Sequence, residues 1–259
     1  MFRKVFFYCL VIFLSACGPA AQPTSAPAPV ISLRPSVTPT TALVPTPTVI
    51  PPTASPAPTA TADPNFFRDD FVGALDSKWT WLREDPVNWS LATVPGSLQI
   101  NVAGGYVPQH TNFNVLLRPA PAGDFQIETQ ITFSPQDNFQ FAGLIIYESD
   151  SDFIQAGRSY CHTFACVGEG LYMNAYKKGA LVPPDFGQSY RDSNPILLRL
   201  SRQGNTYTFE ANTNGKVWFV IGSQTSDMKP LQVGLVAGQN LKGHVLPALF
   251  DYFEVRSLP

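Results

Sequence analysis

Three tryptophans stand among charged and amide side chains near the start of the region that can fold. Trp79 and Trp81 would share one face of an extended strand, and Trp89 follows; the residues between them include Arg83, Glu84, Asp85 and Asn88. Tryptophan rings stack on the C–H faces of pyranose sugars, and polar neighbours bind the hydroxyl groups. We therefore take Trp81 with Arg83 as the first candidate for an exposed sugar-binding platform, with core packing as the alternative.

A second candidate is the alternating run Tyr172, Asn174 and Tyr176. In a strand these three side chains point to one face and combine two aromatic rings with an amide. Core packing is again the alternative.

Catalytic chemistry would need other patterns. Glycoside hydrolysis uses two carboxylates, about 5–5.5 Å apart in retaining enzymes. Glu148, Asp150 and Asp152 alternate, but the sequence Ser-Asp-Ser-Asp after Leu144–Tyr147 is typical of a turn. The three histidines, His110, His162 and His244, have no metal-binding spacing, and there is no Gly-x-Ser-x-Gly elbow or phosphate loop. The sequence therefore indicates no catalytic residues.

The N-terminus has the pattern of an export signal. Arg3 and Lys4 precede the apolar run Val5–Leu14, which is too short for the roughly 20 residues that span a bilayer. The next residues, Leu14-Ser15-Ala16-Cys17, resemble the lipobox of bacterial lipoproteins. That resemblance implies a signal peptide over residues 1–17 and a diacylglycerol on Cys17, which anchors the protein to the extracytoplasmic face of the cell membrane. The alternative is an ordinary secretory signal that is cleaved elsewhere.

The segment from residue 18 to residue 65 is dominated by Pro, Thr, Ala, Ser and Val. Such a segment cannot bury enough apolar surface to offset its chain entropy. We expect a disordered, extended stalk between the membrane and a folded domain.

The composition restricts the kinds of molecule that the protein could bind. Charged residues are only 14% of the chain and the net charge is −2, so the clustered Lys and Arg of nucleic-acid-binding proteins are missing and we expect no such partner. Cys161 and Cys166 are the only cysteines after Cys17. In an exported protein their spacing favours a small disulfide loop over free thiols, and zinc would need more ligands than His162 supplies.

Residues 66–259 have the pattern of a single all-β domain. From Phe125 to Phe133 apolar and polar residues alternate, which is typical of a strand with one buried face. Asn214-Gly215 and Gly204-Asn205 separate strand-like runs and predict hairpins. Further predicted strands cover residues 97–102, 139–147, 171–176, 231–237 and 248–255. No convincing helical stripe is present, so we predict a sandwich of two antiparallel sheets.

Four motifs carry a family resemblance. They are Phe67–Leu91, with its acidic pair, Leu-Asp, Trp-x-Trp and Trp-Ser-Leu, followed by Pro95–Leu98, Asn114–Arg118 and Ala142–Tyr147. In order and spacing they resemble the concanavalin A-like domain appended to family 43 β-xylosidases, and related freestanding modules. The resemblance implies a jelly roll, a fold that hosts lectins, glucanases and non-catalytic helper domains. In β-xylosidases the catalytic carboxylates lie in a separate hydrolase domain, and glucanases of this fold use Glu-x-Asp-x-x-Glu, whose second Glu is missing from Glu148–Asp152.

The resemblance also raises the question of calcium. Many concanavalin A-like domains hold a structural Ca²⁺ between acidic residues near the first and last strands. Asp70 and Asp251 are the candidates here, with Asp69 as a third ligand. Asp251 is expected to be in phase with Leu249, Phe253 and Val255 and partly buried. The alternative is an Asp that is hydrogen-bonded beside a turn, and no cofactor is required by the sequence.

These observations predict a lipid-anchored cell-surface protein whose sandwich binds a polysaccharide without catalysis. A structural or protein-interaction module without a sugar site is the first alternative. A glycoside hydrolase is the second.

Overall fold

The computed structural model describes residues 65–163, 166–192 and 195–259. The predicted signal peptide, Cys17 and the predicted stalk up to residue 64 lie outside the described residues. Within the described part, the only helices are two short 3₁₀ turns, Pro86–Asn88 and Val107–Gln109. None of its helices is long and apolar enough to cross a membrane.

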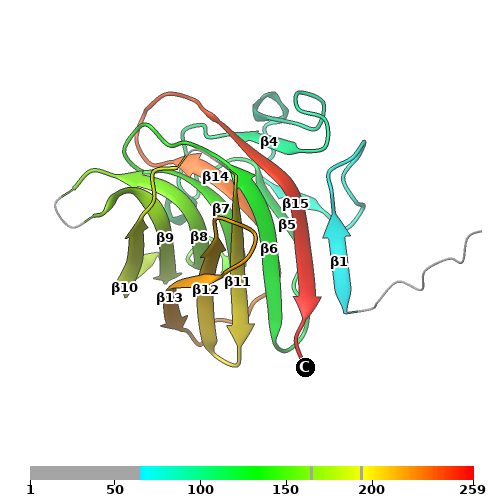
Figure 1. The fold of residues 1–259 in the computed structure, drawn as a ribbon, viewed down its shortest axis with the longest axis vertical. Helices are drawn as coiled ribbons and strands as arrows, with labels where there is room; N and C mark the ends of the chain where they lie inside the picture. Colours follow the sequence, from blue (N-terminus) through cyan, green and yellow to red (C-terminus); the bar gives the residue numbers. More distant parts are fainter. Residues whose placement is uncertain (1–64, 164–165, 193–194) are drawn as a thin grey trace, which may run out of the picture. The chain divides into compact units, whose positions relative to one another are not determined.

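The domain consists of two antiparallel sheets, as predicted (Figure 1). The eight-stranded sheet contains β1 (Phe66–Asp69), β3 (Trp89–Ser90), β4 (Leu98–Asn101), β6 (Phe125–Thr132), β11 (Ile196–Gln203), β12 (Thr206–Asn212), β13 (Phe219–Thr225) and β15 (Pro247–Ser257). The seven-stranded sheet contains β2 (Thr80–Leu82), β5 (Val115–Pro119), β7 (Gln140–Ser149), β8 (Asp152–Cys161), β9 (Gly168–Lys177), β10 (Ala180–Ser189) and β14 (Gln232–Gln239). Its strand order is β10-β9-β8-β7-β14-β5-β2, and β1 pairs with β15 at the border of the other sheet.

The strands with alternating side chains form where the pattern predicts them. In β6 every second residue is buried, and Phe125, Ile127 and Ile131 enter the core between the sheets. Gly204-Asn205 connects β11 directly to β12, with Gly204 at φ 59°, where glycine is favoured. The Asn214-Gly215 hairpin is longer, because Asn214 Oδ1 accepts the backbone N–H groups of Lys216 and Val217 before β13 begins.

The two longest strands without a prediction, β8 and β10, were each hidden for a physical reason. In β8 nearly every residue is buried, because side chains pack on both faces of this central strand, so no alternation appears. β10 is an edge strand that is exposed along most of its length and contains Pro183 and Pro184. Proline is tolerated at an edge because the edge has a free hydrogen-bonding side.

The predicted phase of β15 is wrong at Asp251. The register with β6 shifts between Phe250 and Tyr252, so this strand has a bulge. Ala248, Phe250, Phe253 and Val255 therefore face the core, while Asp251 stays half-buried on the outer face. Alternation read from the sequence cannot show such a bulge, because one extra residue inverts the phase.

The seven-stranded sheet also carries apolar side chains on the face that points away from the other sheet. This outer-face cluster consists of Val107, Val115, Leu117, Phe141, Ile145, Tyr147, Phe153 and Val236, with Leu82 and Tyr176 at its margin. Burying such a side chain stabilises the fold by roughly 1.5–3 kcal/mol. The segment 103–114, here called the covering loop, contributes Val107 to this cluster.

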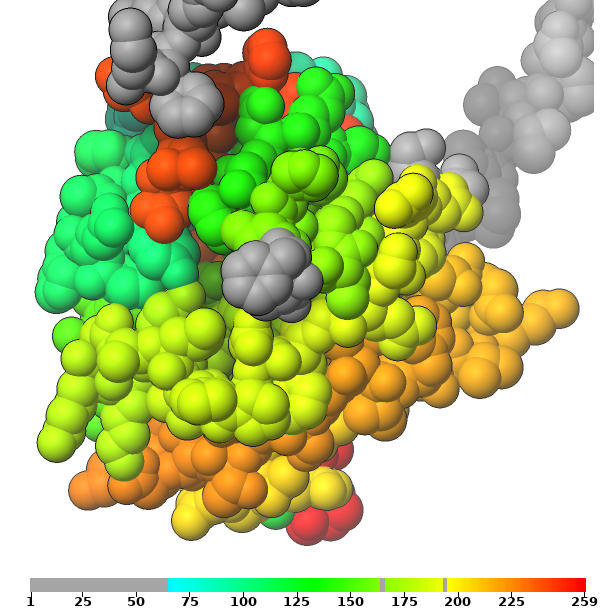
Figure 2. Space-filling view, turned by 90° about the vertical axis from the view of Figure 1, so that its left-hand side faces the viewer, coloured from blue at the N-terminus to red at the C-terminus, as the bar shows by residue number. Residues whose placement is uncertain are grey.

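Hydrogen bonds tie the covering loop to β14. The Gly105 N–H donates to the Gln239 carbonyl at 3.0 Å, and Asn112 Nδ2 donates to the Ala237 carbonyl at 3.3 Å. The loop crosses so close that a Cβ on Gly238 would lie 1.9 Å from Asn112 Oδ1. In Figure 2 the covering loop (blue-green) appears on the same face of the molecule as β9 and β10 (yellow-green).

Candidate functional site

The structure places the first predicted pair, Trp81 and Arg83, on different faces of the seven-stranded sheet. Trp81 is half-buried against the core between the sheets, and its ring centroid lies 4.9 Å from that of Trp89. Arg83 has φ 56°, which breaks the alternation after β2. Its side chain reaches the outer face, where Nε donates to the Asn112 carbonyl at 2.6 Å. The two side chains therefore do not form one platform.

Arg83 is held in place by Asp150. Its two terminal nitrogens donate to the two carboxylate oxygens at 2.7 and 3.0 Å. Asp150 also accepts the Tyr147 hydroxyl at 3.1 Å and lies 3.1 Å from His110 Nδ1. Burial, reinforced by the Asp150 charge, raises the pKa of Tyr147 to about 12. This cluster fixes the C-terminal part of the covering loop, at His110 and Asn112, to the turn between β7 and β8.

The acidic run at residues 148–152 forms the predicted turn. Asp150 and Ser151 connect β7 to β8, and Ser149 Oγ accepts the backbone N–H groups of Ser151 and Asp152. Glu148 accepts the Lys229 backbone N–H at 2.9 Å. The carboxylates therefore hold loops together, and they do not face each other across a groove.

The second predicted set, Tyr172, Asn174 and Tyr176, shares the outer face of β9. The strand register places these residues beside Gly157, Gln155 and Phe153 of β8, in that order. The Tyr172 hydroxyl donates to the Gly168 carbonyl at 2.6 Å, and its ring leans over Gly187, where a Cβ would approach it to 3.0 Å. Tyr172 therefore packs against β9 and β10, and little of its ring surface is available to a ligand.

The Tyr176 ring is also engaged with protein. It stacks on Phe153 with 4.7 Å between ring centroids and 16° between planes, and its hydroxyl contacts that of Tyr106 in the covering loop. Burial is the main cause that raises the pKa of Tyr176. Tyr106 and Tyr176 therefore join the covering loop to the sheet.

The same outer face carries two amide side chains beside these tyrosines. Gln155 and Asn174 are direct cross-strand partners on the outer face. Gln155 is 5% exposed and Asn174 is half-buried. Neither side chain forms a hydrogen bond within the described residues, and neither is among the fully buried polar groups without a partner, so both amides keep some contact with solvent. Gln155 borders a hollow of about 20 Å³ beneath the covering loop, which holds no more than a water molecule. A ligand larger than a water molecule cannot enter this hollow and must bind on the surface of the outer face. The sequence does not single out Gln155, because nearly every residue of β8 is buried and no alternating pattern marks one face.

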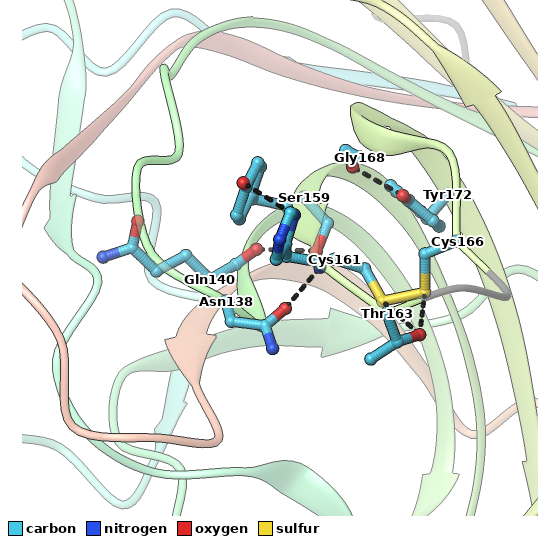
Figure 3. The surroundings of a disulfide bond; sticks show 10 residues. Asn138, Gln140, Ser159, Cys161, Thr163, Cys166, Gly168 and Tyr172 are labelled. Carbon is cyan, nitrogen blue, oxygen red and sulfur yellow. Dashed lines mark hydrogen bonds between the residues drawn. A yellow bond between two sulfur atoms is a disulfide. The ribbon is translucent and has the colours of Figure 1, made fainter. Parts of the chain in front are cut away.

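A disulfide closes the connection between β8 and β9 (Figure 3). Cys161 and Cys166 are bonded with a Cα–Cα distance of 5.6 Å. Around this bond, Asn138 accepts the His162 backbone N–H at 2.7 Å, and the Ser159 hydroxyl donates to the Gln140 carbonyl at 2.6 Å. The bond therefore fixes a short loop at the end of two long strands.

The acidic residues proposed for calcium have protein partners. Asp70 forms an ion pair with Arg68 at 2.7 Å, and Asp251 accepts hydrogen bonds from Ser97 and Gln130. Asp69 accepts three N–H groups, from the Phe71 and Asp76 backbones and from Trp79 Nε1. Within the described residues no cluster of three or more His, Cys, Asp or Glu could hold a metal. This donor set does not fit Ca²⁺, which takes six to eight oxygens.

Comparison with known proteins agrees with this architecture. Residues 68–256 match the family described as the β-xylosidase C-terminal concanavalin A-like domain. No curated protein matches the chain.

Several solved structures with the same fold are parts of larger proteins. The GH43 BlXynB protein from Bacillus licheniformis has 20% identity and a TM-score of 0.67, over 76% of this chain and 40% of that one. The xylan β-1,4-xylosidase from Bacillus halodurans C-125 has 21% identity and a TM-score of 0.64, over 76% and 40% of the two chains. The chain thus spans about 40% of the length of these proteins. A glycosyl hydrolase family protein from Mycobacterium fortuitum matches at 14% identity and TM-score 0.51, over 73% of this chain and 98% of that one. The matched residues and the two-sheet fold together show that this chain belongs to the family of β-xylosidase C-terminal concanavalin A-like domains.

Proposed function

We propose that this protein is a lipid-anchored, cell-surface module that binds polysaccharide without hydrolysing it. The observation that carries the sugar-binding part is the pair Gln155 and Asn174. Asn174 lies half-buried on the outer face between Tyr172 and Tyr176, and Gln155 is its cross-strand partner, 5% exposed; no hydrogen bond within the described residues involves either amide. An amide offers two donors and an acceptor, the groups that bind adjacent sugar hydroxyls.

The face can hold a sugar chain only as a shallow contact. The hollow beside Gln155 is too small for a sugar ring, and the tyrosine rings are packed against protein. Recognition of the sugar chain therefore depends on hydrogen bonds from the two amides, together with contacts to the edges of the tyrosine rings. Such a face gives weak affinity for one sugar and gains from repeated units along a polymer.

Family membership supports a role beside polysaccharide-degrading enzymes. The similar solved structures include family 43 proteins and a xylan β-1,4-xylosidase. In the chain described here the acidic run at residues 148–152 is used to hold loops, which agrees with a binding role.

A binding assay on the full chain tests the sugar site. The chain is titrated with xylans, glucans and arabinans in affinity gels and by calorimetry. Asn174→Ala and Gln155→Ala should each weaken binding by about threefold to tenfold, the value of one net hydrogen bond. Gln126→Ala is the matched control, because Gln126 is a half-buried amide on the outer face of the other sheet. If the unaltered chain binds none of these polysaccharides, the sugar-binding proposal is wrong.

Membrane fractionation tests the anchor separately. In the sequence, Cys17 follows Leu14-Ser15-Ala16. Cys17→Ser should move the protein from the membrane fraction to the soluble fraction and abolish incorporation of labelled palmitate. Cys9→Ser is the matched control, since Cys9 lies within the predicted signal peptide. Retention of the Cys17→Ser protein in membranes would remove the lipid anchor from the proposal.

A further inference from the structure

A groove at the border between the two sheets has no part in the proposed sugar face. It lies where β1, the end of β5 and the end of β15 meet, and has a volume of about 420 Å³. Its lining includes Phe66, Phe67, Lys78, Arg118, Pro119 and Pro121. Among the described residues that line it there are two cations and no carboxylate.

Arg118 is the unusual residue of this groove. It is only 5% exposed, and its Nε and Nη1 atoms are buried without a hydrogen-bond partner. Its Cζ lies 3.0 Å from the ring centroid of Phe67 and 5.2 Å from that of Trp79, so aromatic rings hold the guanidinium. A buried charge normally has an anionic or hydrogen-bonded partner.

The nearby carboxylates do not fill this role. Asp69 is occupied by the Phe71, Asp76 and Trp79 N–H groups, and it acts on Arg118 only through its charge, as does Asp76. Burial lowers the pKa of Arg118 to about 10, so the group remains charged at neutral pH and is incompletely compensated.

We propose that this groove binds the carboxylate of an acidic sugar, a uronate, between Arg118 and Lys78. A carboxylate is planar and singly charged, and it matches one guanidinium together with one ammonium. A phosphate carries more charge and more oxygens and would need further N–H donors. Pro119 and Pro121 supply none, and the N–H of Ala120 between them donates to the Leu231 carbonyl. The apolar walls from Phe66, Pro119 and Pro121 suit the C–H face of the sugar ring.

The test uses the full chain and oligogalacturonate in low salt, with binding measured by calorimetry. The methyl-esterified oligomer is the matched neutral ligand. The acid form should bind at least tenfold more tightly than the ester, and selectively ¹⁵N-labelled arginine should show one Nε resonance that shifts on binding. Equal binding of acid and ester would overturn the proposal, and so would stronger competition by inorganic phosphate than by acetate.

Variants locate the site without depending on Arg118, whose replacement could unfold the domain. Lys78 is exposed, and Lys78→Glu places an anion in the groove, so binding should fall about tenfold. Lys216→Glu makes the same charge change on the exposed loop before β13 and should alter binding less than twofold. Equal effects of the two variants would show non-specific attraction and would contradict the site. The results for Lys78→Glu and Lys216→Glu do not depend on the results for Asn174→Ala and Gln155→Ala. The proposed uronate groove and the proposed function can therefore fail separately.

Discussion

At the scale of single residues, Asp150 shows how much one carboxylate can organise. It receives both terminal nitrogens of Arg83 and the Tyr147 hydroxyl, and its side chain is 13% exposed. Asp150→Ala leaves the Arg83 charge without its partner, and we expect the free energy of unfolding to fall by about 1–3 kcal/mol. Urea denaturation measures this. Asp227→Ala is the control, because its ion pair with Lys177 is open to solvent and should contribute nothing measurable. Equal losses in the two variants would contradict the role of Asp150.

Asp69 is a second residue whose role differs between sequence and structure. The sequence places it in an acidic pair that could bind calcium, whereas the structure shows three N–H groups directed at its carboxylate. We therefore expect EGTA to leave the Tm of the full chain unchanged. Asp69→Ala should lower the free energy of unfolding by about 1–3 kcal/mol, because the buried Trp79 indole loses its acceptor. A lower Tm in EGTA that returns with calcium would show that a metal site exists after all.

At the scale of elements, the sequence predicts best where one face of a strand is wet. β6 alternates along its whole length, and β9 alternates from Met173 to Tyr176, within the run where the sequence predicts a strand. The fully buried β8 and the exposed edge β10 have no such contrast and were missed. The platform of Trp81 and Arg83 failed for a different reason. Arg83 has a positive φ, and its side chain contacts Asn112 and Asp150, which are distant in sequence, so local alternation does not indicate its direction.

The covering loop is the element that most directly shapes the candidate site, and Gly238 tests its packing. Alanine at this position would place a Cβ 1.9 Å from Asn112 Oδ1 and 2.9 Å from the Gly105 carbonyl oxygen. We expect Gly238→Ala to lower the free energy of unfolding by about 1–3 kcal/mol, through displacement of the loop.

Two further variants separate this crowding from other effects of alanine. Gly104→Ala is the control, because no atom lies within 4 Å of the Cβ it would add. Gly238→Ala should cost less when Asn112→Ala is already present, since the nearest obstructing atom is then gone. Additive losses in a double-mutant cycle would mean that the loop does not cross Gly238 as described.

At the scale of the whole molecule, tyrosines packed on both faces of the sheets make the stability of the fold depend on pH. The buried Tyr147 has a pKa of about 12 in the fold against about 10 in an unfolded chain, and burial also raises the pKa values of Tyr172, Tyr176, Tyr207 and Tyr252. A raised pKa means that the fold favours the protonated phenol. The stability from these groups is therefore complete below pH 10 and is lost as the pH rises from about 10 towards 12.

Urea denaturation at successive pH values should show this decline, and absorbance near 295 nm should show most tyrosines ionising only as the protein unfolds. Tyr147→Phe, which keeps the ring without the ionising hydroxyl, should make the decline between pH 10 and 12 less steep. Stability that is constant across this range, or tyrosines that ionise near pH 10 in the folded protein, would show that solvent reaches these side chains and that the packing on the outer face is looser than described.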